Sequence, residues 1–263
     1  MTLKLLLSSF FVFLLSLPAL AEEPAVSSSS PVNITADALE YHEADKTYVA
    51  RGHAEIVQGT VTLKAAVITA HFVVTPDGKT EVTQALAEGG VEIVSGDNKV
   101  TGERGIYEVA RGVAVLKGGE LRLTTPQDVV TARDSLEYWE KDRVAVARGN
   151  AVAVRGDKRV EADVLTAALE ENAQKQLEVR RLGADGNVVI TTPAEIARGD
   201  KGVYDVAQQK AVLDGNVRLT RGQNQLNGAR AEVNMATGVS RLLSGGGRRV
   251  SGLIVPKDAP EVQ

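Results

Sequence analysis

Histidines are the first side chains to examine for chemistry, because an imidazole can carry a proton or bind a metal near neutral pH. The chain has 3, at His42, His53 and His71, and none has a second histidine at metal-ligand spacing. Cysteine is absent, which excludes thiol catalysis and cysteine-based metal sites. We therefore expect the histidines to be surface or turn residues, and we expect neither a metal nor a cofactor.

Sequence motifs for catalysis are missing as well. The chain contains no G-x-S-x-G, Walker, H-E-x-x-H or G-x-G-x-x-G pattern. Acidic pairs such as Glu170-Glu171 are too many and too loosely placed to nominate an acid and a base. The run Gly245–Arg249 (GGGRR) could hold a phosphate, although its glycines are more typical of a flexible turn, and Asn33-Ile34-Thr35 matches only the short glycosylation pattern. We predict no catalytic residues and no enzymatic activity.

The chain does carry an internal duplication. Asp37–Ala70 recurs 97 residues later as Asp134–Ala167, and the offset continues downstream. Identical pairs at this offset include Leu39/Leu136, Tyr41/Tyr138, Val49/Val146, Arg51/Arg148, Gly52/Gly149, Gly102/Gly199 and Tyr107/Tyr204. An internal repeat of this kind indicates that the fold is built from two similar units, so it is considered before the individual strands. We place the copies at about 32–128 and 129–225, with a closing segment at 226–256.

A shorter unit repeats inside each copy, in which a tyrosine is followed eleven residues later by a glycine. It occurs at Tyr41–Gly52, Tyr107–Gly118, Tyr138–Gly149 and Tyr204–Gly215. The residue after the glycine is His, Gly, Asn and Asn in turn. Because glycine and asparagine accept positive φ at tight corners, the unit predicts two short strands joined by a turn, the second of which ends at a corner.

Apolar and polar residues alternate over short segments, as at Val61, Leu63 and Ala65. Period-two alternation predicts strands with one buried face. Leu165–Leu182 has the composition of a helix, yet it occupies the position that Ile68–Leu86 fills in the first copy, where the pattern is strand, turn, strand. We therefore predict strands there too, joined by a loop around residues 170–174, and no long helix between residues 32 and 255.

Some predicted strands are apolar on both faces. Within residues 143–155, the alanines share one parity and the valines share the other: Ala145, Ala147, Ala151 and Ala153 against Val144, Val146, Val152 and Val154. One face can serve the core, whereas the other must be covered or must face a ligand or a neighbouring subunit. The alternative is that the valines face a second layer of the same protein.

The two ends of the chain differ from the repeats. Residues 1–21 have one lysine, an apolar run at Leu5–Leu17 and the ending Ala-Leu-Ala, which is typical of a secretory signal peptide cleaved between Ala21 and Glu22. The alternative is an uncleaved membrane anchor, although the run is shorter than the ~20 residues of a spanning helix. Residues 22–31 are expected to be a flexible leader, and residues 257–263 a disordered tail.

The net charge of the chain and the expected edges of its sheet indicate which kinds of partner it can bind. Removing Lys4 with the signal peptide leaves 29 of the 30 basic residues against 34 acidic ones, a net charge of −5, which argues against nucleic-acid binding. A stack of strands ends in edges whose unpaired backbone groups attract another strand. We therefore expect an exported protein that can associate end to end.

Several segments resemble the OstA/LptA family of periplasmic lipopolysaccharide transport proteins. Residues 34–41 (ITADALEY) and 49–68 (VARGHAEIVQGTVTLKAAVI) carry the resemblance, and a strand motif of the Q-G-x-x-I-x-A-D type occurs at Gln58–Ala65 and again at Arg221–Ala229. Arg249–Pro256 (RVSGLIVP) is similar to the last strand of the family. The resemblance covers residues 32–256.

This resemblance implies an all-β fold, an elongated twisted β-jellyroll (or β-taco) of about sixteen or more antiparallel strands around an apolar groove. It implies a periplasmic protein that binds the acyl chains of lipopolysaccharide and carries the lipid from the inner to the outer membrane. The partners implied are lipopolysaccharide, LptC in the inner-membrane complex, LptD/LptE at the outer membrane, and further copies of the same chain end to end.

The groove residues are expected from the parity of the aligned strands. They are Tyr48, Ala50, Ala54, Ile56, Val61 and Leu63 in the first copy and Ala151, Ala153, Leu213, Val217 and Leu219 in the second. A register error of one residue would turn all of them outward. The alternatives are an exported structural β-solenoid without lipid cargo, a membrane-anchored LptC-like component, and a β-helical polysaccharide-active enzyme, which would need carboxylates clustered on one face.

Overall fold

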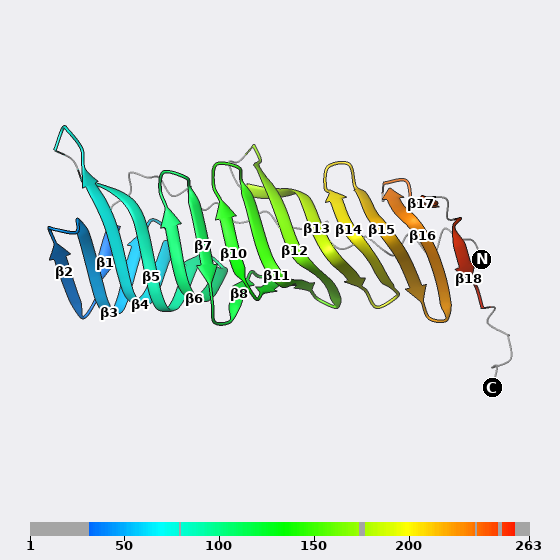
Figure 1. Ribbon diagram of the computed structural model, residues 1–263, viewed down its shortest axis with the longest axis horizontal. Helices are drawn as coiled ribbons and strands as arrows, with labels where there is room; N and C mark the ends of the chain where they lie inside the picture. The colour runs from blue at the N-terminus through cyan, green and yellow to red at the C-terminus, as the bar shows by residue number, and fades with distance from the viewer. Residues whose placement is uncertain (1–31, 79, 174–176, 235, 247–248, 256–263) are drawn as a thin grey trace.

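The computed structural model describes residues 32–78, 80–173, 177–234, 236–246 and 249–255. Eighteen strands form one sheet, their pairings are antiparallel, and no helix occurs in the described ranges. The strands lie side by side across an elongated molecule (Figure 1). The prediction of an all-β jellyroll with sixteen or more antiparallel strands is confirmed. The expected signal peptide with its cleavage site at Ala21 and Glu22, the leader and the tail lie outside the described residues.

The first half of the sheet begins with two short strands that pair with the two ends of one long strand. β1 (Val32–Thr35) and β2 (Ala38–His42) both pair with β3 (Thr47–Gln58). The long strands then follow in order as β4 (Val61–Val74), β5 (Thr80–Ser95) and β6 (Asn98–Glu108), and β6 pairs in turn with β7 (Val113–Lys117) and β8 (Leu121–Thr124).

The second half repeats this plan. β9 (Val129–Ala132) and β10 (Ser135–Trp139) pair with the two ends of β11 (Val144–Arg155). The long strands then follow in order as β12 (Lys158–Glu171), β13 (Leu177–Thr191), β14 (Ile196–Asp205), β15 (Lys210–Arg221) and β16 (Asn224–Asn234). The two ends of β16 pair with the short strands β17 (Val239–Leu243) and β18 (Ser251–Leu253). β7 pairs with β10 and β8 with β9, which joins the halves into one sheet. β12 and β13 confirm the predicted strands in the segment with helical composition.

Every long strand bends near its middle, and the bends are neighbours from strand to strand. Pairing registers shift there, for example between Arg148 and Ala151 in β11. Two consecutive residues have positive φ at each bend of an odd-numbered long strand, at 52–53, 89–90, 149–150, 186–187 and 215–216. They include three of the four predicted corners, at Gly52, Gly149 and Gly215, which are therefore bends within continuous strands. The fourth predicted corner, Gly118, separates β7 from β8.

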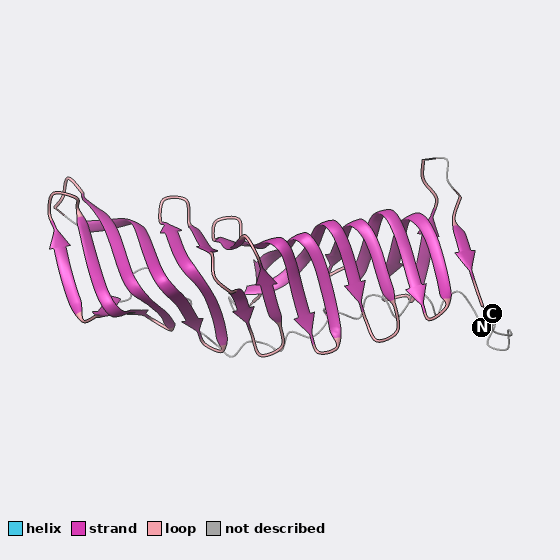
Figure 2. Cartoon of the chain, turned by 60° about the horizontal axis from the view of Figure 1, so that its bottom comes forward, coloured by secondary structure: helices cyan, strands magenta, loops and turns pink. Residues whose placement is uncertain are grey.

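The bend divides the sheet into two walls. Wall A contains β2, β7, β10 and β17 with the strand halves that pair with them, and wall B contains β1, β8, β9 and β18 with theirs. The strands curve around the long axis of the molecule, as Figure 2 shows from below. Within the described residues, β1 and β2 pair only with β3, and β17 and β18 only with β16. Each end of the stack therefore presents strand edges.

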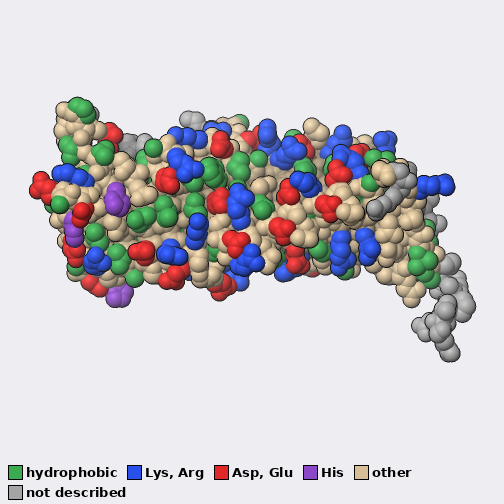
Figure 3. Space-filling model, viewed as in Figure 1, with side chains coloured by type: hydrophobic (Ala, Val, Ile, Leu, Met, Phe, Trp, Pro, Cys, Tyr) green, Lys and Arg blue, Asp and Glu red, His purple; other side chains and the backbone are tan. Residues whose placement is uncertain are grey.

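The histidines lie at one end of the molecule and are visible in Figure 3. His53 is a bend residue with φ 46°, and its Nδ1 is 2.9 Å from Oδ2 of Asp37. His42 is exposed beside Glu40, and His71 is half-buried in β4. Their positions agree with the expected surface or turn roles. Among the described residues, no group of three or more His, Cys, Asp or Glu side chains could hold a metal ion.

Candidate functional site

The candidate site is the inner face of the bent sheet, meaning the side on which walls A and B turn toward each other. Two clusters of buried apolar side chains lie on it, one spanning residues 50–151 and one spanning 162–233. Leu165 packs against both clusters. Residues directly opposite each other on paired strands share a face, so the pairing registers define the inner face along the whole molecule.

The predicted groove residues all have inner-face register. Ala50, Ala54, Ile56 and Leu63 belong to or pack against the first cluster, as does Ala151, whereas Leu213, Val217 and Leu219 belong to the second. Tyr48 lies opposite Ala70, Val61 lies opposite Gln58 and Ser95, and Ala153 lies opposite Val160. The structure thus brings the predicted residues together on one surface, and their contact with a ligand stays a prediction.

Sequence reasoning missed more inner-face residues than it found, most clearly on the strands from which it named none. They come from β5, β6, β7, β8, β10, β13 and β16 and are Ala87, Val91, Ile93, Val100, Leu116, Leu121, Leu123, Leu136, Val188, Ile190, Leu226, Ala231 and Val233. The duplication offered a signal for some of them, because Val91 and Ile93 stand 97 residues before Val188 and Ile190.

The bends complicate simple alternation. On odd-numbered long strands the inner-face residues flanking the bend are four apart, as Ala50 and Ala54 are, so parity is kept. On even-numbered strands they are three apart, as Ala65 and Ile68 are in β4, so parity changes. A strict period of two would therefore assign half of each even-numbered strand to the wrong face.

Along β4 and β11, inner-face side chains beside the bend are buried and most of those farther out are half-buried, although Phe72 at the wall A end of β4 is buried again. In β4, Ala65 and Ile68 are buried, whereas Val61, Leu63 and Ala70 are half-buried. In β11, Ala147 and Ala151 are buried, whereas Ala145 and Ala153 are half-buried. The two walls therefore pack closely at the bend and leave apolar side chains partly exposed away from it.

The inner face is most exposed at the β1–β2 end. Ile34 is 41%, Leu39 61% and Tyr41 52% exposed, and their partners on β3 place all three on the inner face. The rings of Tyr41, Tyr48 and Phe72 lie together here, with centroids 5.0–5.9 Å apart. By contrast, the inner face is closed in the second half, where Leu213 is 0% and Leu219 4% exposed.

One ionisable side chain is buried at the wall B rim of the inner face. Glu195 lies in the loop between β13 and β14 and is 5% exposed. Burial raises the pKa of Glu195 to about 7, against the opposing effect of the Arg221 cation. Oε1 of Glu195 has no hydrogen-bond partner among the described residues. No pattern in the sequence marks this site, because a glutamate in a loop is ordinarily solvated.

The valines of β11 with the opposite parity lie on the outer face of the sheet. Val146 is directly opposite Glu137 of β10 and is buried. Glu137 accepts hydrogen bonds from Ser135 (2.7 Å), Arg148 (2.9 Å) and Trp139 (3.0 Å), and these hydrogen bonds lower the pKa of its carboxyl despite partial burial. Polar side chains of the same wall therefore lie beside this valine, and within the described residues no second layer of strands covers it.

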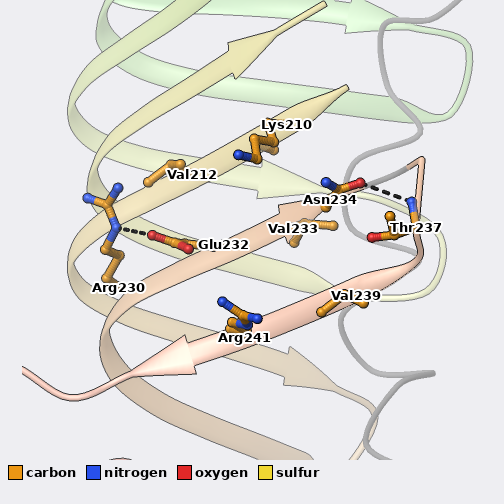
Figure 4. Close-up of a pocket in the computed structure, with 10 residues that line it drawn as sticks. Lys210, Val212, Arg230, Glu232, Val233, Asn234, Thr237, Val239 and Arg241 are labelled. Carbon is orange, nitrogen blue, oxygen red and sulfur yellow. Dashed lines mark hydrogen bonds and ion pairs between the residues drawn. The ribbon is translucent and has the colours of Figure 1, made fainter. Parts of the chain in front are cut away.

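A hollow of about 400 Å³ lies on the outer face of wall A, beside β15, β16 and β17 (Figure 4). Its lining includes Lys210, Val212, Arg230, Glu232, Asn234, Thr237, Val239 and Arg241. Arg230 donates to Glu232 at 2.7 Å and to Asp214 at 2.8 Å, and the hydrogen bond to Glu232 raises the pKa of Arg230. Since these charges are paired and lie across the sheet from the inner face, the hollow is not part of the candidate site.

The charges of the outer face are mixed in sign. Cationic, anionic and apolar side chains are intermixed over the face shown in Figure 3. Pairs such as Arg51–Glu40 and Lys201–Asp185 are exposed on both sides, and such pairs contribute little to stability. No helix long and apolar enough to cross a membrane occurs in the part of the chain that the structure describes.

The comparisons with known proteins agree with the repeated architecture. A family model described as "LptA/(LptD N-terminal domain) LPS transport protein" matches residues 33–134 and again residues 130–239. An uncharacterised protein of Rhizobium meliloti (strain 1021) is 27% identical over 133 residues, which are 49% of this chain and 72% of that protein.

A solved structure is also similar. LptH, described as the LptA-homologous periplasmic component of the lipopolysaccharide transport device of Pseudomonas aeruginosa, is matched over 88% of this chain and 100% of its own, with 12% identity and a TM-score of 0.22. The two family-model matches together cover most of the chain, which confirms the resemblance found in the sequence. The chain therefore belongs to the LptA/LptD N-terminal-domain family of lipopolysaccharide transport proteins.

Proposed function

We propose that this protein is a periplasmic bridge component that binds lipopolysaccharide on its inner face and guides it from the inner to the outer membrane. The observation that carries the proposal is the continuity of the apolar inner face, which runs from Ile34 on β1 to Leu242 on β17 and is partly exposed, most of all in the first half. Its signal peptide would direct export, and cleavage between Ala21 and Glu22 would release the mature chain into the periplasm.

The energetics favour a lipid as the ligand of such a face. Each methylene group that leaves water contributes roughly 0.8 kcal/mol, so acyl chains would bind along half-buried side chains such as Leu63 and Ala153. The sugar headgroup would remain in water at the rims. Nothing in this role requires bond chemistry, so the protein acts as a passive guide and the direction of transport comes from a partner.

The ends of the stack suggest how the bridge is continued. β1 and β2 present edges at one end, and β17 and β18 present edges at the other. A strand added at such an edge extends the sheet through backbone hydrogen bonds. We infer that one edge meets LptC of the inner-membrane complex, the other meets LptD/LptE, and further copies of this chain join end to end between them.

A structural β-solenoid without lipid cargo is the alternative. The observation that favours it is the closure of the inner face in the second half, where Ala197 and Leu213 are 0% exposed. A solid core of this kind stabilises a scaffold without leaving room for an acyl chain unless the walls separate.

Native mass spectrometry of residues 22–263 with and without purified lipopolysaccharide tests the proposal. Bound lipid together with a concentration-dependent series of oligomers is the expected result. An Ile56→Asp variant should lose lipid, whereas Val57→Asp, which alters the adjacent outward position on β3, should retain it. A monomer that ignores lipopolysaccharide at all concentrations would favour the structural solenoid instead.

A further inference from the structure

The charged residues at the wall B rim of the inner face are concentrated in the second half of the molecule, and Asp128 at the end of the first copy is paired with one of them. We define the second-half lip as Arg155, Lys158, Thr192, Glu195 and Arg221. Arg155 lies opposite Lys158, and the backbone N–H of Thr192 donates to the carbonyl of Glu195 at 3.0 Å. Each residue lies two positions from an inner-face residue, namely Ala153, Val160, Ile190, Ala197 and Leu219, so alternation places the lip on the inner face.

The first half provides a direct comparison, because the duplication supplies a counterpart for each lip residue. At an offset of 97 residues the counterparts are Gln58, Val61, Ser95, Asn98 and Thr124. Not one of these side chains is charged, although Gln58, Val61, Ser95 and Asn98 follow one another across paired strands in the same way. The two copies therefore share the fold of the rim and differ in its chemistry.

Glu195 is the unusual member of the second-half lip. It is 95% buried, since its exposed fraction is 5%, and its Oε1 has no hydrogen-bond partner among the described residues. A buried polar atom without a partner costs free energy and calls for an explanation. The loop holds Glu195 in place, because Oγ1 of Thr192 accepts from its backbone N–H at 3.1 Å and donates to its carbonyl at 3.2 Å.

Cations flank this carboxyl group. Arg221 is its neighbour on β15, because Ile196 lies opposite Thr220. Lys158 is its neighbour on the other side through Thr192, because Arg159 lies opposite Thr191. Both cations have other interactions in the structure, but an ammonium group carries three donors and a guanidinium group five, which gives each the capacity to bind an anion as well. Arg155 is paired with Asp128 at 2.5 Å.

We propose that the second-half lip is a polar subsite of the lipid groove, in which Oε1 of Glu195 accepts a hydrogen bond from an amide N–H or hydroxyl group of the acylated headgroup while Lys158 and Arg221 contact its phosphate. The proposal rests on the proposed function and adds a headgroup site to it. Lipid A matches this set, because its amide-linked and hydroxylated acyl chains carry donors next to phosphorylated sugars. The donors of the ligand would satisfy an acceptor that the protein leaves unpaired.

The test compares two lipids on one set of variants. Lipopolysaccharide has amide and hydroxyl donors at the base of its acyl chains, whereas phosphatidic acid has a phosphate and ester-linked chains without amide groups. Binding of both lipids to the mature chain would be measured for the wild type, Glu195→Leu, Glu195→Gln and Lys158→Ala. The matched control is Asn98→Leu, which makes the same apolar substitution at the counterpart position in the first half.

The Glu195→Leu variant should bind lipopolysaccharide about tenfold to a hundredfold more weakly, which is the effect of one hydrogen bond to a charged group. Its affinity for phosphatidic acid should not change. Lys158→Ala should weaken the binding of both lipids. Glu195→Gln should lose less affinity for lipopolysaccharide than Glu195→Leu, because its amide oxygen can still accept a hydrogen bond. Asn98→Leu should bind both lipids as the wild type does.

Three outcomes would overturn the assignment. Unchanged lipopolysaccharide affinity in Glu195→Leu would show that the carboxyl group does not contact the headgroup. An equal loss for both lipids would give Glu195 a structural role only, and an equal loss in Asn98→Leu would remove the distinction between the halves. If the wild type bound neither lipid, the proposed function itself would fail, which is a separate result from the first three.

Discussion

Asp134 lies against Gly149 at the bend of β11, so that a Cβ atom on this glycine would meet the aspartate carboxylate well inside contact distance. Gly149 also has a φ of 83°, a conformation that side chains disfavour. The same relationship recurs between Asp37 and Gly52, and between Asp200 and Gly215. The bends therefore favour glycine for its backbone conformation, and at these three positions a larger residue would also displace an aspartate side chain.

Replacing Gly149 with alanine should destabilise the protein by about 1–3 kcal/mol, because the backbone at positive φ is strained and the exposed Asp134 side chain must turn away from the added methyl group. The measurement is the urea midpoint of unfolding. The control is Gly156→Ala, where φ is also positive at 57° but no atom lies within 4 Å of the added carbon, so a loss of only about 1 kcal/mol is expected. Equal losses at the two positions would mean that the aspartate contact does not matter.

Position along the inner face should decide the effect of a buried charge. Leu219 and Ile56 each lie two residues from the wall B rim, but Leu219 in the second half is 4% exposed, whereas Ile56 at the β1–β2 end is half-buried. Leu219→Asp should cost several kcal/mol, about 3–5, because an unpaired carboxylate is buried. Ile56→Asp should cost less, about 1–2 kcal/mol, because water reaches the new carboxylate. Thermal unfolding of the two variants tests this order, and similar losses would contradict the observed difference in burial.

The duplication offers an internal control for the Glu137 hydrogen bonds. Glu137 has a side chain only 11% exposed and accepts from Ser135, Trp139 and Arg148, whereas its counterpart Glu40 is 40% exposed beside His42 and Arg51. Glu137→Ala should therefore destabilise by about 2 kcal/mol, and Glu40→Ala by less than about 1 kcal/mol.

Acid should remove part of the contribution of Glu137. Its folded pKa lies below the ordinary value of 4.5, so the stabilisation is present above that pH and is lost as the pH falls through the folded pKa. Chemical denaturation between neutral and acid pH would show the difference between wild type and Glu137→Ala shrinking on acidification. A constant difference would mean that the carboxylate charge is not involved.

Glu195 should have the opposite pH dependence. Its pKa is about 7 in the folded protein, above the ordinary value of 4.5, so the folded state holds the proton between these values. The free energy of unfolding should therefore fall as the pH rises from about 4.5 to about 7, by about 3 kcal/mol in all.

The Glu195→Gln variant provides the measurement for this prediction. It lacks the ionisable group, so it should become more stable than the wild type as the pH rises to 8, while the two should converge near pH 4.5. Denaturant unfolding at a series of pH values would give both curves. Parallel curves would show that Glu195 keeps an ordinary pKa in the folded protein.

The sequence by itself determined the class of the fold and much of the inner face. The offset between Asp37–Ala70 and Asp134–Ala167 established the duplication, and it predicted strands rather than a helix at Leu165–Leu182. The alternation of residues along a strand was sufficient to assign positions such as Ile56 and Leu219 to the inner face, because alternation between two faces is a local property of a strand. Glycine followed by asparagine marked the corners, since few other residues accept positive φ in succession.

Only the tertiary structure decided what happens at the bends and at the rims. The step of three between Ala65 and Ile68 follows from the pairing of β4 with β3 and β5, strands whose registers shift at the bend. The burial of Glu195 depends on β12 and β15 packing beside its loop, which no local pattern encodes. The alternation of faces along a strand depends on residues that are adjacent in the sequence. Burial depends on residues from other strands, and these come into contact only once the sheet has bent.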